Sequence, residues 1–339
     1  MARCIYCRSE LNDNSPPDEL TRSREHIVPF AIGGSNAFST FDVSKKYNND
    51  YGRDIDAKFI DLLPISIKRQ MLNLVGQSGK VPPIVWRGKS MDNGAPSTIT
   101  IHADWKVECE FDISTDRIDK KTHEILSVSG DADKVKEILF GMLEKYKKHG
   151  KRIYSVSGEE ITTMDDFSRH YDIEESNNFG SSIVAFDLDV WTRGIFKMIL
   201  GLGHVLLGPD WTFSSDGGDR FRTVLEMDRQ RWPINSMKGF TTGELPSEIA
   251  NVLGIDQEVR EQNRHTLAIL PYEGQTVAVV SLFGGKDIPE ALVGLGGERG
   301  KLAVVNETMN PKARIGVQID PTTRGVEWIT VEALVKAVQ

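Results

Sequence analysis

The chain has 339 residues, of which 39% are hydrophobic and 27% charged, and it carries a net charge of −8. This length exceeds that of one small domain, and the composition is that of a soluble globular protein. The N-terminus MARCIYCRSE lacks the apolar core of a signal peptide, and no window reaches about 18 uninterrupted apolar residues. Only three cysteines are present, which excludes a disulfide framework. We therefore expect a cytoplasmic protein without a membrane span.

The acidic charge is unevenly distributed along the chain. Residues 1–80 contain 11 Lys and Arg against 10 Asp and Glu, whereas the remaining residues contain 30 against 39. The acidic part suits a protein partner or a signal ligand better than a second contact with nucleic acid. The nearly neutral N-terminal part can still present a basic surface to phosphate, with candidates Arg22, Arg24, Lys45, Lys46, Arg53 and Lys58. Charge alone favours the simpler interpretation, in which these six are solvated surface residues.

The first 97 residues show few long elements. Residues 1–62 contain a Cys-x-x-Cys, a short β-like run and a Gly-Gly turn, and the spacing of apolar residues predicts a short helix from Asn48 to Leu63. A stretch rich in Gly, Pro and Ser, from Val75 to about Ser97, predicts a linker.

The remaining residues predict a mixture of strands and helices. Residues 98–113 predict a strand pair, 131–149 an amphipathic helix, and 189–207 a buried apolar helix ended by Gly208-Pro209. Residues 266–283 predict a hairpin around Glu273-Gly274, residues 301–317 further strands, and residues 331–338 a terminal helix. His204 is expected in the core or at a helix end, and His265 at a solvated strand edge. This part is α+β, and its periodicity indicates no particular function.

The segment that could carry chemistry is SREHIVPFAIGG (23–34), followed by SKKYNN (44–49). Glu25-His26 places a hard oxygen ligand beside an imidazole. Successive side chains of a strand point to opposite faces, so a bulge or a strand end is needed for both to share one site. Asn48 and Asn49 open the next helix, where an amide oxygen can complete a Mg²⁺ shell. Such parts suffice for phosphodiester hydrolysis, with His26, neutral near pH 7, taking a proton from water.

These motifs together resemble the HNH (ββα-metal) endonuclease family, in its bacterial form with Cys-x-x-Cys, Glu-His-Ile-x-Pro, Gly-Gly and Cys-x-x-Cys-Asn. The resemblance covers about residues 3–60. It implies that His26 is the general base and that Glu25 and Asn48 hold one Mg²⁺ or Mn²⁺ ion, with Asn49 the neighbour that could take the place of Asn48. It also implies an endonuclease acting on nucleic acid, DNA more than RNA, and a place among restriction or phage-defence effectors.

The sequence departs from the family pattern at two places. The second Cys-x-x-Cys is replaced by Ser44-Lys45-Lys46-Tyr47, so only Cys4 and Cys7 are left of a four-ligand zinc site. We therefore expect no structural zinc, with Tyr47 packing where the metal would lie. The family's middle residue, often Asn, is Ser39 here, and its hydroxyl is expected to bond the imidazole in its place.

The fold expected from all this is α+β. A small HNH module (1–75) is joined by a linker (76–97) to a larger α+β domain (98–339) for recognition, sensing or assembly. Two other interpretations stay open. One is a non-catalytic protein that binds nucleic acid or a partner on a degenerate HNH fold, and the other is a redox or metal sensor built on Cys4 and Cys7.

Overall fold

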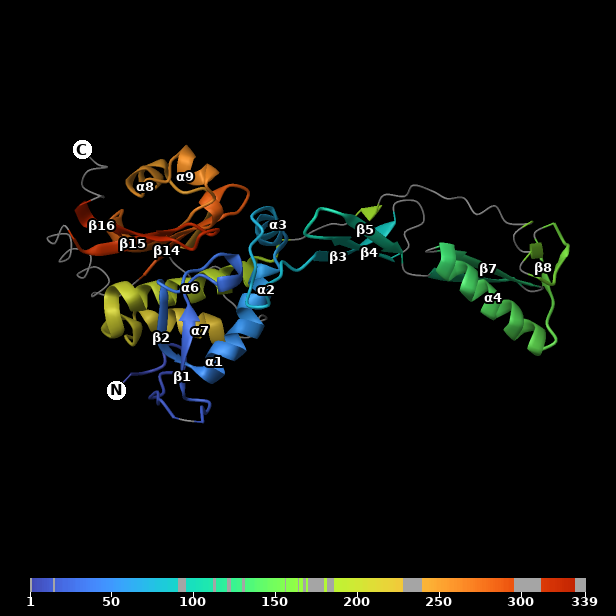
Figure 1. Ribbon diagram of the computed structural model, residues 1–339, viewed down its shortest axis with the longest axis horizontal. Helices are drawn as coiled ribbons and strands as arrows, with labels where there is room; N and C mark the ends of the chain where they lie inside the picture. Colours follow the sequence, from blue (N-terminus) through green and yellow to red (C-terminus); the bar gives the residue numbers. More distant parts are fainter. Residues whose placement is uncertain are drawn as a thin grey trace. The chain divides into compact units, whose positions relative to one another are not determined.

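The computed structural model describes residues 2–14, 16–90, 96–111, 114–120, 123–129, 132–155, 157–163, 165–166, 169, 180–181, 186–227, 240–295 and 312–332. The chain forms two compact units: unit 1 contains residues 1–81 and 186–339, and unit 2 contains residues 82–185 (Figure 1). The mixture of helices and sheets confirms the α+β class. The unit boundaries differ from the expected domains, because residues 98–339 are divided between the two units. The stretch predicted as a linker also contains strand β3 (Ile84–Ser90).

The N-terminal module belongs to unit 1 and has the order of a hairpin followed by helices. Strands β1 (Arg22–His26) and β2 (Ser39–Ser44) are antiparallel, and the 3₁₀ turn η1 (Phe30–Ile32) lies in the loop between them. The predicted helix over 48–63 corresponds to a continuous helical run made of α1 (Lys45–Tyr51), a π-helical turn η2 (Gly52–Asp56) and α2 (Ala57–Ile60). A separate helix, α3 (Leu63–Met71), follows it.

A six-stranded antiparallel sheet forms the other half of unit 1. Its strand order is β11 (Phe240–Gly243), β14 (Glu290–Gly294), β13 (Gln275–Ser281), β12 (His265–Tyr272), β15 (Arg314–Ile319) and β16 (Val326–Thr330). The predicted hairpin around Glu273-Gly274 is confirmed as β12–β13. Both turn residues have positive φ, which is the backbone that a two-residue hairpin turn requires.

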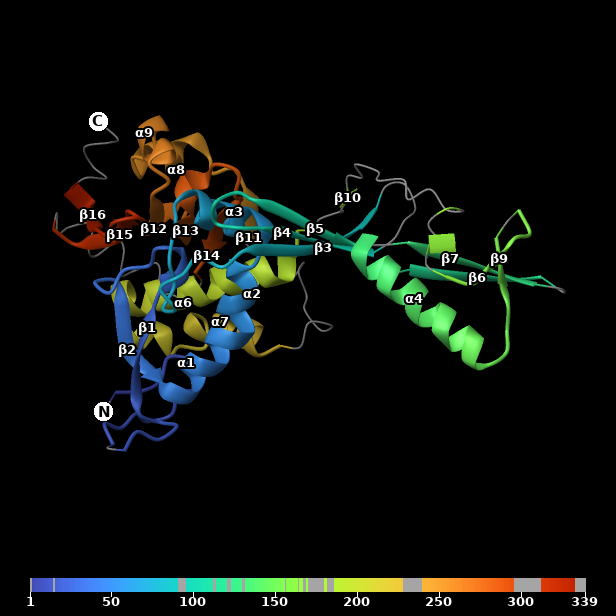
Figure 2. The same cartoon turned by 45° about the vertical axis from the view of Figure 1, so that its right-hand side comes forward.

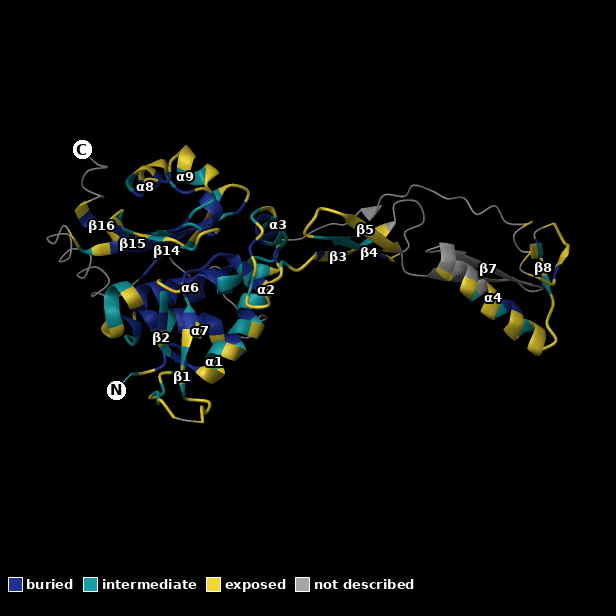
Figure 3. Ribbon diagram, in the orientation of Figure 1, coloured by how far each residue is buried: buried dark blue, intermediate teal, exposed yellow. Residues whose placement is uncertain are grey.

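The two faces of this sheet are covered by different elements. Alternate residues of β12, such as Leu267 and Ile269, enter the core that contains the N-terminal module and helix α6 (Leu188–Thr212). The intervening residues, such as Ala268 and Leu270, pack in a second core with α8 (Ser247–Val252), on the face that α8 and α9 (Gln257–Glu261) cover. Helix α7 (Gly218–Glu226) lies beside α6, and the 3₁₀ turn η5 (Phe283–Gly285) follows β13. The inner strands β12, β13 and β14 are therefore buried on both faces, whereas the edge strands β11 and β16 are mostly intermediate or exposed (Figure 3).

Helix α6 is the central helix of unit 1 (Figure 2). The expected end at Gly208-Pro209 is a kink, with Gly208 at φ 82°, after which one more turn continues to Thr212. By length and composition α6 is the one helix in the described part of the chain that could span a membrane. However, 72% of its most apolar window is buried within the structure, and its side chains form the core.

The N-terminal module and the sheet share one hydrophobic core, and polar contacts tie them together. His265 is fully buried, so its expected place at a solvated edge is wrong. Its Nε2 donates to the Ile32 carbonyl oxygen over 2.8 Å, and its Nδ1 accepts from the Phe283 N–H over 3.1 Å. Gly33 has φ 97°, and a Cβ there would lie 2.4 Å from Pro321, so the Gly-Gly loop is pressed against the sheet.

Unit 2 contains a four-stranded sheet in the order β10 (Gly180–Ser181), β3, β4 (Pro96–Ile101) and β5 (Val107–Phe111). It also contains helix α4 (Ala132–Lys148) and two hairpins, β6 (Ser114–Lys120) with β7 (His123–Ser129), and β8 (Ile153–Tyr154) with β9 (Glu160–Ile161). The predicted strand pair over 98–113 and the predicted helix over 131–149 are confirmed. The expected strands before Lys312 and the terminal helix beyond Glu332 lie outside the described residues.

Candidate functional site

His26 ends strand β1 and is half-buried. Its Nε2 lies 2.9 Å from the Asn36 side-chain oxygen, which also accepts from Arg24 over 3.1 Å. An arginine only donates hydrogen bonds, so the contacted Asn36 atom is the oxygen and Nε2 of His26 must carry the proton. The lone pair of a neutral His26 is then on Nδ1, which has no hydrogen-bond partner in the described part of the chain.

The surroundings of His26 keep its imidazole neutral. Burial lowers its pKa from the ordinary value, and the positive charges of Arg24, Arg324 and Lys197 lower it further, whereas the bond to Asn36 opposes the shift. A general base must be unprotonated at neutral pH and must have a nitrogen with a free lone pair. His26 meets both requirements, because its Nε2 bonds Asn36 and its Nδ1 keeps the lone pair.

At Ser39 the structure differs from the expectation. Ser39 is the strand partner of His26, but its hydroxyl donates to the backbone carbonyl of Asn36 over 2.8 Å and makes no contact with the imidazole. The amide that bonds the imidazole comes from Asn36, three residues earlier. Ser39 thus stabilises the loop that contains Asn36. Sequence analysis did not identify Asn36, because the family motif has its middle Asn at the position of Ser39.

Glu25 also lies elsewhere than expected. The strand register shifts between Ser23 and Glu25, so the irregularity lies before Glu25 and not between Glu25 and His26. The side chains of Glu25 and His26 therefore keep the usual alternation of a strand and point to opposite sides. The Glu25 side chain is buried, 5% exposed, and forms an ion pair with Lys197 of α6, which is 2% exposed. The Lys197 ammonium lies 2.7 Å from Asp56 as well, and the Tyr6 hydroxyl donates to Glu25 over 3.2 Å.

In this buried cluster one ammonium, that of Lys197, contacts two carboxylates, those of Glu25 and Asp56. Burial alone would lower the pKa of Lys197, but the carboxylates of Asp56 and Glu25 raise it above its ordinary value, so the ammonium stays charged. Burial raises the pKa of Glu25, and Lys197 opposes that rise. Sequence analysis did not identify Lys197. The one feature that could have indicated it is a charged residue in the middle of an apolar helix.

The expected metal ligands do not share a site as they lie here. The Asn48 amide nitrogen donates to the Ser23 hydroxyl over 2.7 Å and to the Arg24 carbonyl over 2.8 Å, so Asn48 joins α1 to β1. Asn49 is exposed. The Glu25 carboxylate is already neutralised by an ammonium ion. Among the described residues no group of three His, Cys, Asp or Glu side chains could hold a metal ion. The residues present therefore do not fit the ion that the family implies.

The two cysteines of the Cys-x-x-Cys make protein contacts with Ser44 and the core. Cys4 is buried, and its Sγ accepts from the Ser44 N–H over 3.4 Å. Ser44 also caps α1, since its hydroxyl accepts from the Tyr47 N–H over 3.3 Å. Cys7 and Tyr47 pack, partly buried, against the core. Burial raises the pKa of the Cys4 thiol, which disfavours the thiolate that metal binding or redox chemistry needs.

The expected phosphate contacts fall into two groups. Arg22, Lys46 and Arg53 form ion pairs with neighbouring aspartates. Arg24 and Lys45 form none among the described residues. Arg24 lies beside His26, with its guanidinium over the Phe41 ring at 5.1 Å. A further cation near His26 is Arg324, from the turn after β15, which the sequence did not indicate because it lies almost 300 residues away.

Comparison with known proteins adds one match. No curated protein and no solved structure matches this chain. The model of a family described as HNH endonuclease matches residues 4–64, which contain the Cys-x-x-Cys, the β1–β2 hairpin and helices α1 and α2. Members of this family typically use a divalent metal ion. The N-terminal part of the chain, with His26 at its centre, is thus similar in sequence to the HNH endonucleases.

Proposed function

We propose that this protein is an endonuclease that hydrolyses phosphodiester bonds of DNA, with His26 as its general base. One observation carries the proposal: the hydrogen bond to Asn36 favours the proton on Nε2 of His26, which leaves the lone pair on Nδ1 without a hydrogen-bond partner among the described residues. The family match supports nuclease chemistry, and Arg24 beside His26, which forms no ion pair with a described residue, supports a phosphate ligand.

The reaction is then a displacement at phosphorus. Nδ1 of His26 takes a proton from a water molecule while the water oxygen forms a bond to phosphorus and the bond to the 3′ oxygen breaks. The proton stays on His26 until solvent removes it, and the leaving oxygen takes a proton from solvent. No step is assigned to a metal ion, because Glu25 is held by Lys197.

A plasmid-nicking assay tests the proposal. The intact protein is expected to nick supercoiled DNA, and His26→Ala should lower the rate by about 10²–10⁴-fold. His149→Ala is the control, because His149 is exposed, directly follows α4 of unit 2, and its ring bonds the backbone carbonyl of Lys145. Arms with Mg²⁺, Mn²⁺ and EDTA measure the ion requirement. Wild-type cutting by His26→Ala would remove His26 from the mechanism, and absence of cutting under all conditions would favour the non-catalytic binding protein.

The cellular role proposed on the family resemblance is restriction or phage defence, acting in the cytoplasm. It predicts that cells carrying the intact gene resist phage, and that the His26→Ala form does not protect them. Equal plating of phage on both would reject this role and leave the nuclease proposal standing. The acidic part of the chain is then the candidate for a protein partner or a signal ligand.

A further inference from the structure

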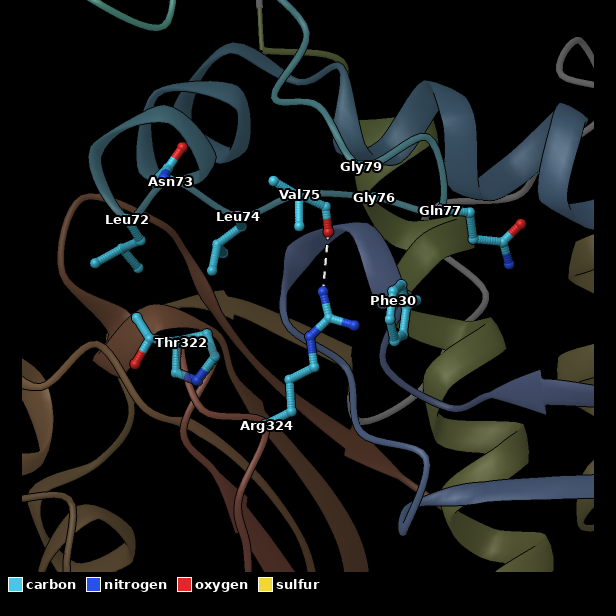
Figure 4. A pocket seen from close by; sticks show the side chains of 11 residues that line it. Phe30, Leu72, Asn73, Leu74, Val75, Gly76, Gln77, Gly79, Thr322 and Arg324 are labelled. Atoms are coloured by element: carbon cyan, nitrogen blue, oxygen red, sulfur yellow. Dashed lines mark hydrogen bonds between the residues drawn. The ribbon is translucent and has the colours of Figure 1, made fainter.

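A pocket of about 470 Å³ lies within unit 1 beside the N-terminal module (Figure 4). Its lining comes from Phe30 in η1, the loop after α3, and the turn between β15 and β16. Apolar side chains such as Leu72 and Leu74 alternate there with polar ones such as Gln77 and Thr322. This volume falls within the range of sites for small organic groups, roughly 300–1,000 Å³, and the mixed lining is typical of them.

Arg324 is the charged residue of the lining. Its guanidinium carbon lies 3.3 Å from the centre of the Phe30 ring, and its Nη2 donates to the Val75 carbonyl oxygen over 2.9 Å (Figure 4). These two contacts fix the guanidinium in place. Arg324 forms no ion pair with any residue that the structure describes, and its other N–H groups have no such partner. A fixed guanidinium with free donors suits a phosphate group.

The pocket lies next to His26, the proposed general base. The Phe30 ring, over which the Arg324 guanidinium lies, also contacts the His26 ring, with 5.1 Å between the ring centres. The loop that holds Phe30 is anchored on the sheet by the hydrogen bond between His265 and Ile32 and by the close approach of Gly33 to Pro321. The C-terminal sheet therefore sets the position of Arg324 relative to His26. Phe30 is thus in contact with both His26 and Arg324.

We propose that this pocket binds one nucleotide of the cleaved DNA strand, with Arg324 on its phosphate and its base among the apolar residues. The inference rests on the proposed nuclease function and adds a substrate site to it. A base that is stacked in a duplex cannot enter a pocket, so the nucleotide must leave the stack. Unstacking costs free energy, which is smaller for an unpaired base. DNA with one unpaired nucleotide beside the cleavage point is therefore the preferred substrate.

The test measures binding without cleavage, in full-length His26→Ala protein. Fluorescence anisotropy compares a fully paired DNA duplex with duplexes that carry one unpaired nucleotide. The unpaired form should bind about tenfold more tightly. Two further changes address the pocket: Arg324→Gln removes the charge, and Val75→Trp fills the space from a residue that is 36% exposed. The matched control is Arg314→Gln, because Arg314 also lies over an aromatic ring of the same sheet, Trp328, and is absent from the lining.

Each pocket variant should remove the preference for the unpaired nucleotide, and Arg324→Gln should weaken binding of that DNA by about tenfold or more. Arg314→Gln should leave both unchanged. Retention of the preference by both pocket variants overturns the inference but not the nuclease proposal. Failure of the unaltered protein to bind or cut any DNA overturns the nuclease proposal itself. Binding of free nucleoside monophosphates at Arg324 without any preference between the duplexes would make the occupant a free nucleotide, and so reject a strand site.

Discussion

The buried ion cluster of Glu25, Lys197 and Asp56 predicts a large loss of stability when Lys197 is changed to Met. Methionine fills much of the volume of the lysine stem but removes the ammonium that contacts both carboxylates. Glu25 is then left as a buried carboxyl without a cation, because the Tyr6 hydroxyl is its remaining hydrogen-bond partner among the residues that the structure describes. Asp56 keeps partial access to water, with 21% of its side chain exposed.

The magnitude follows from which charge is left uncompensated. Removing one partner of a buried ion pair costs about 3–5 kcal/mol in the free energy of unfolding. For a unit of this size, that corresponds to a fall of about 6–20 °C in melting temperature. The double variant Glu25→Gln with Lys197→Met removes the buried charge as well, and it should recover most of that loss.

The loss should also depend on pH. Without Lys197, burial holds the pKa of Glu25 above its unfolded value, so the folded state binds the proton more tightly than the unfolded chain. Stability then falls as pH rises above the ordinary carboxyl pKa of about 4.3. Lys197→Met should therefore be less destabilised at pH 5 than at pH 8.

Chemical denaturation and thermal melting of the single and double variants measure these effects. Lys68→Met is the matched control: Lys68 is 6% exposed, but its ion-pair partner Asp287 is 70% exposed and becomes hydrated once the lysine is gone. Lys68 also donates to the side-chain oxygen of Asn263, an uncharged partner, over 3.3 Å. That change should cost about 1 kcal/mol. The reasoning is refuted if Lys197→Met melts like the wild type. It is equally refuted if Mg²⁺ raises the melting temperature of the unaltered protein and Glu25→Gln abolishes that rise, because Glu25 would then bind a metal ion.

Three further predictions concern other contacts. Burial lowers the pKa of His265 to about 4, so as pH falls the unfolded chain binds this proton before the folded protein does. Stability should therefore drop between about pH 6.5 and pH 4. His265→Gln should flatten this part of the pH–stability curve, and an unchanged slope would show that His265 does not cause the drop. Asn36→Ala should lower the nicking rate by about tenfold or more and move the acid limb of its pH profile, because the proton is no longer fixed on Nε2 of His26; an unaltered profile would exclude this positioning role. The purified protein should contain no stoichiometric zinc, and Cys4→Ser with Cys7→Ser should cost at most a few kcal/mol; one zinc ion per chain in elemental analysis would show that ligands from elsewhere complete the site.

The elements that the sequence predicted well are those with a strong local signal. The helix over 131–149 has a long amphipathic period, and the hairpin around Glu273-Gly274 combines two β-rich runs with a turn that needs positive φ. The short β-like run and the Gly-Gly turn near His26 were likewise predictable, since Pro29 and the Gly-Gly pair are local features. The next helix begins at Lys45 rather than at the expected Asn48, because Ser44 caps it.

Residues that act through tertiary contacts were not predictable in the same way. Lys197 meets Glu25 only because α6 packs against the hairpin, and Arg324 meets Phe30 only because the sheet packs against the same loop. The alternation of strand β1 was the reason to doubt that Glu25 and His26 share a site, and the structure keeps that alternation. His265 was misplaced because a strand buried on both faces has no solvated side, which periodicity over a few residues cannot reveal.

In the proposed reaction Nδ1 of His26 accepts a proton from the attacking water. Chemical rescue with free imidazole is a direct test of this step. In His26→Ala the imidazole is gone, while Asn36 and Arg24 keep the loop contacts that surround its place. Nicking of supercoiled DNA by this variant should fall by about 10²–10⁴-fold, and added free imidazole should restore part of it. Nicking at the wild-type rate without imidazole would contradict this step.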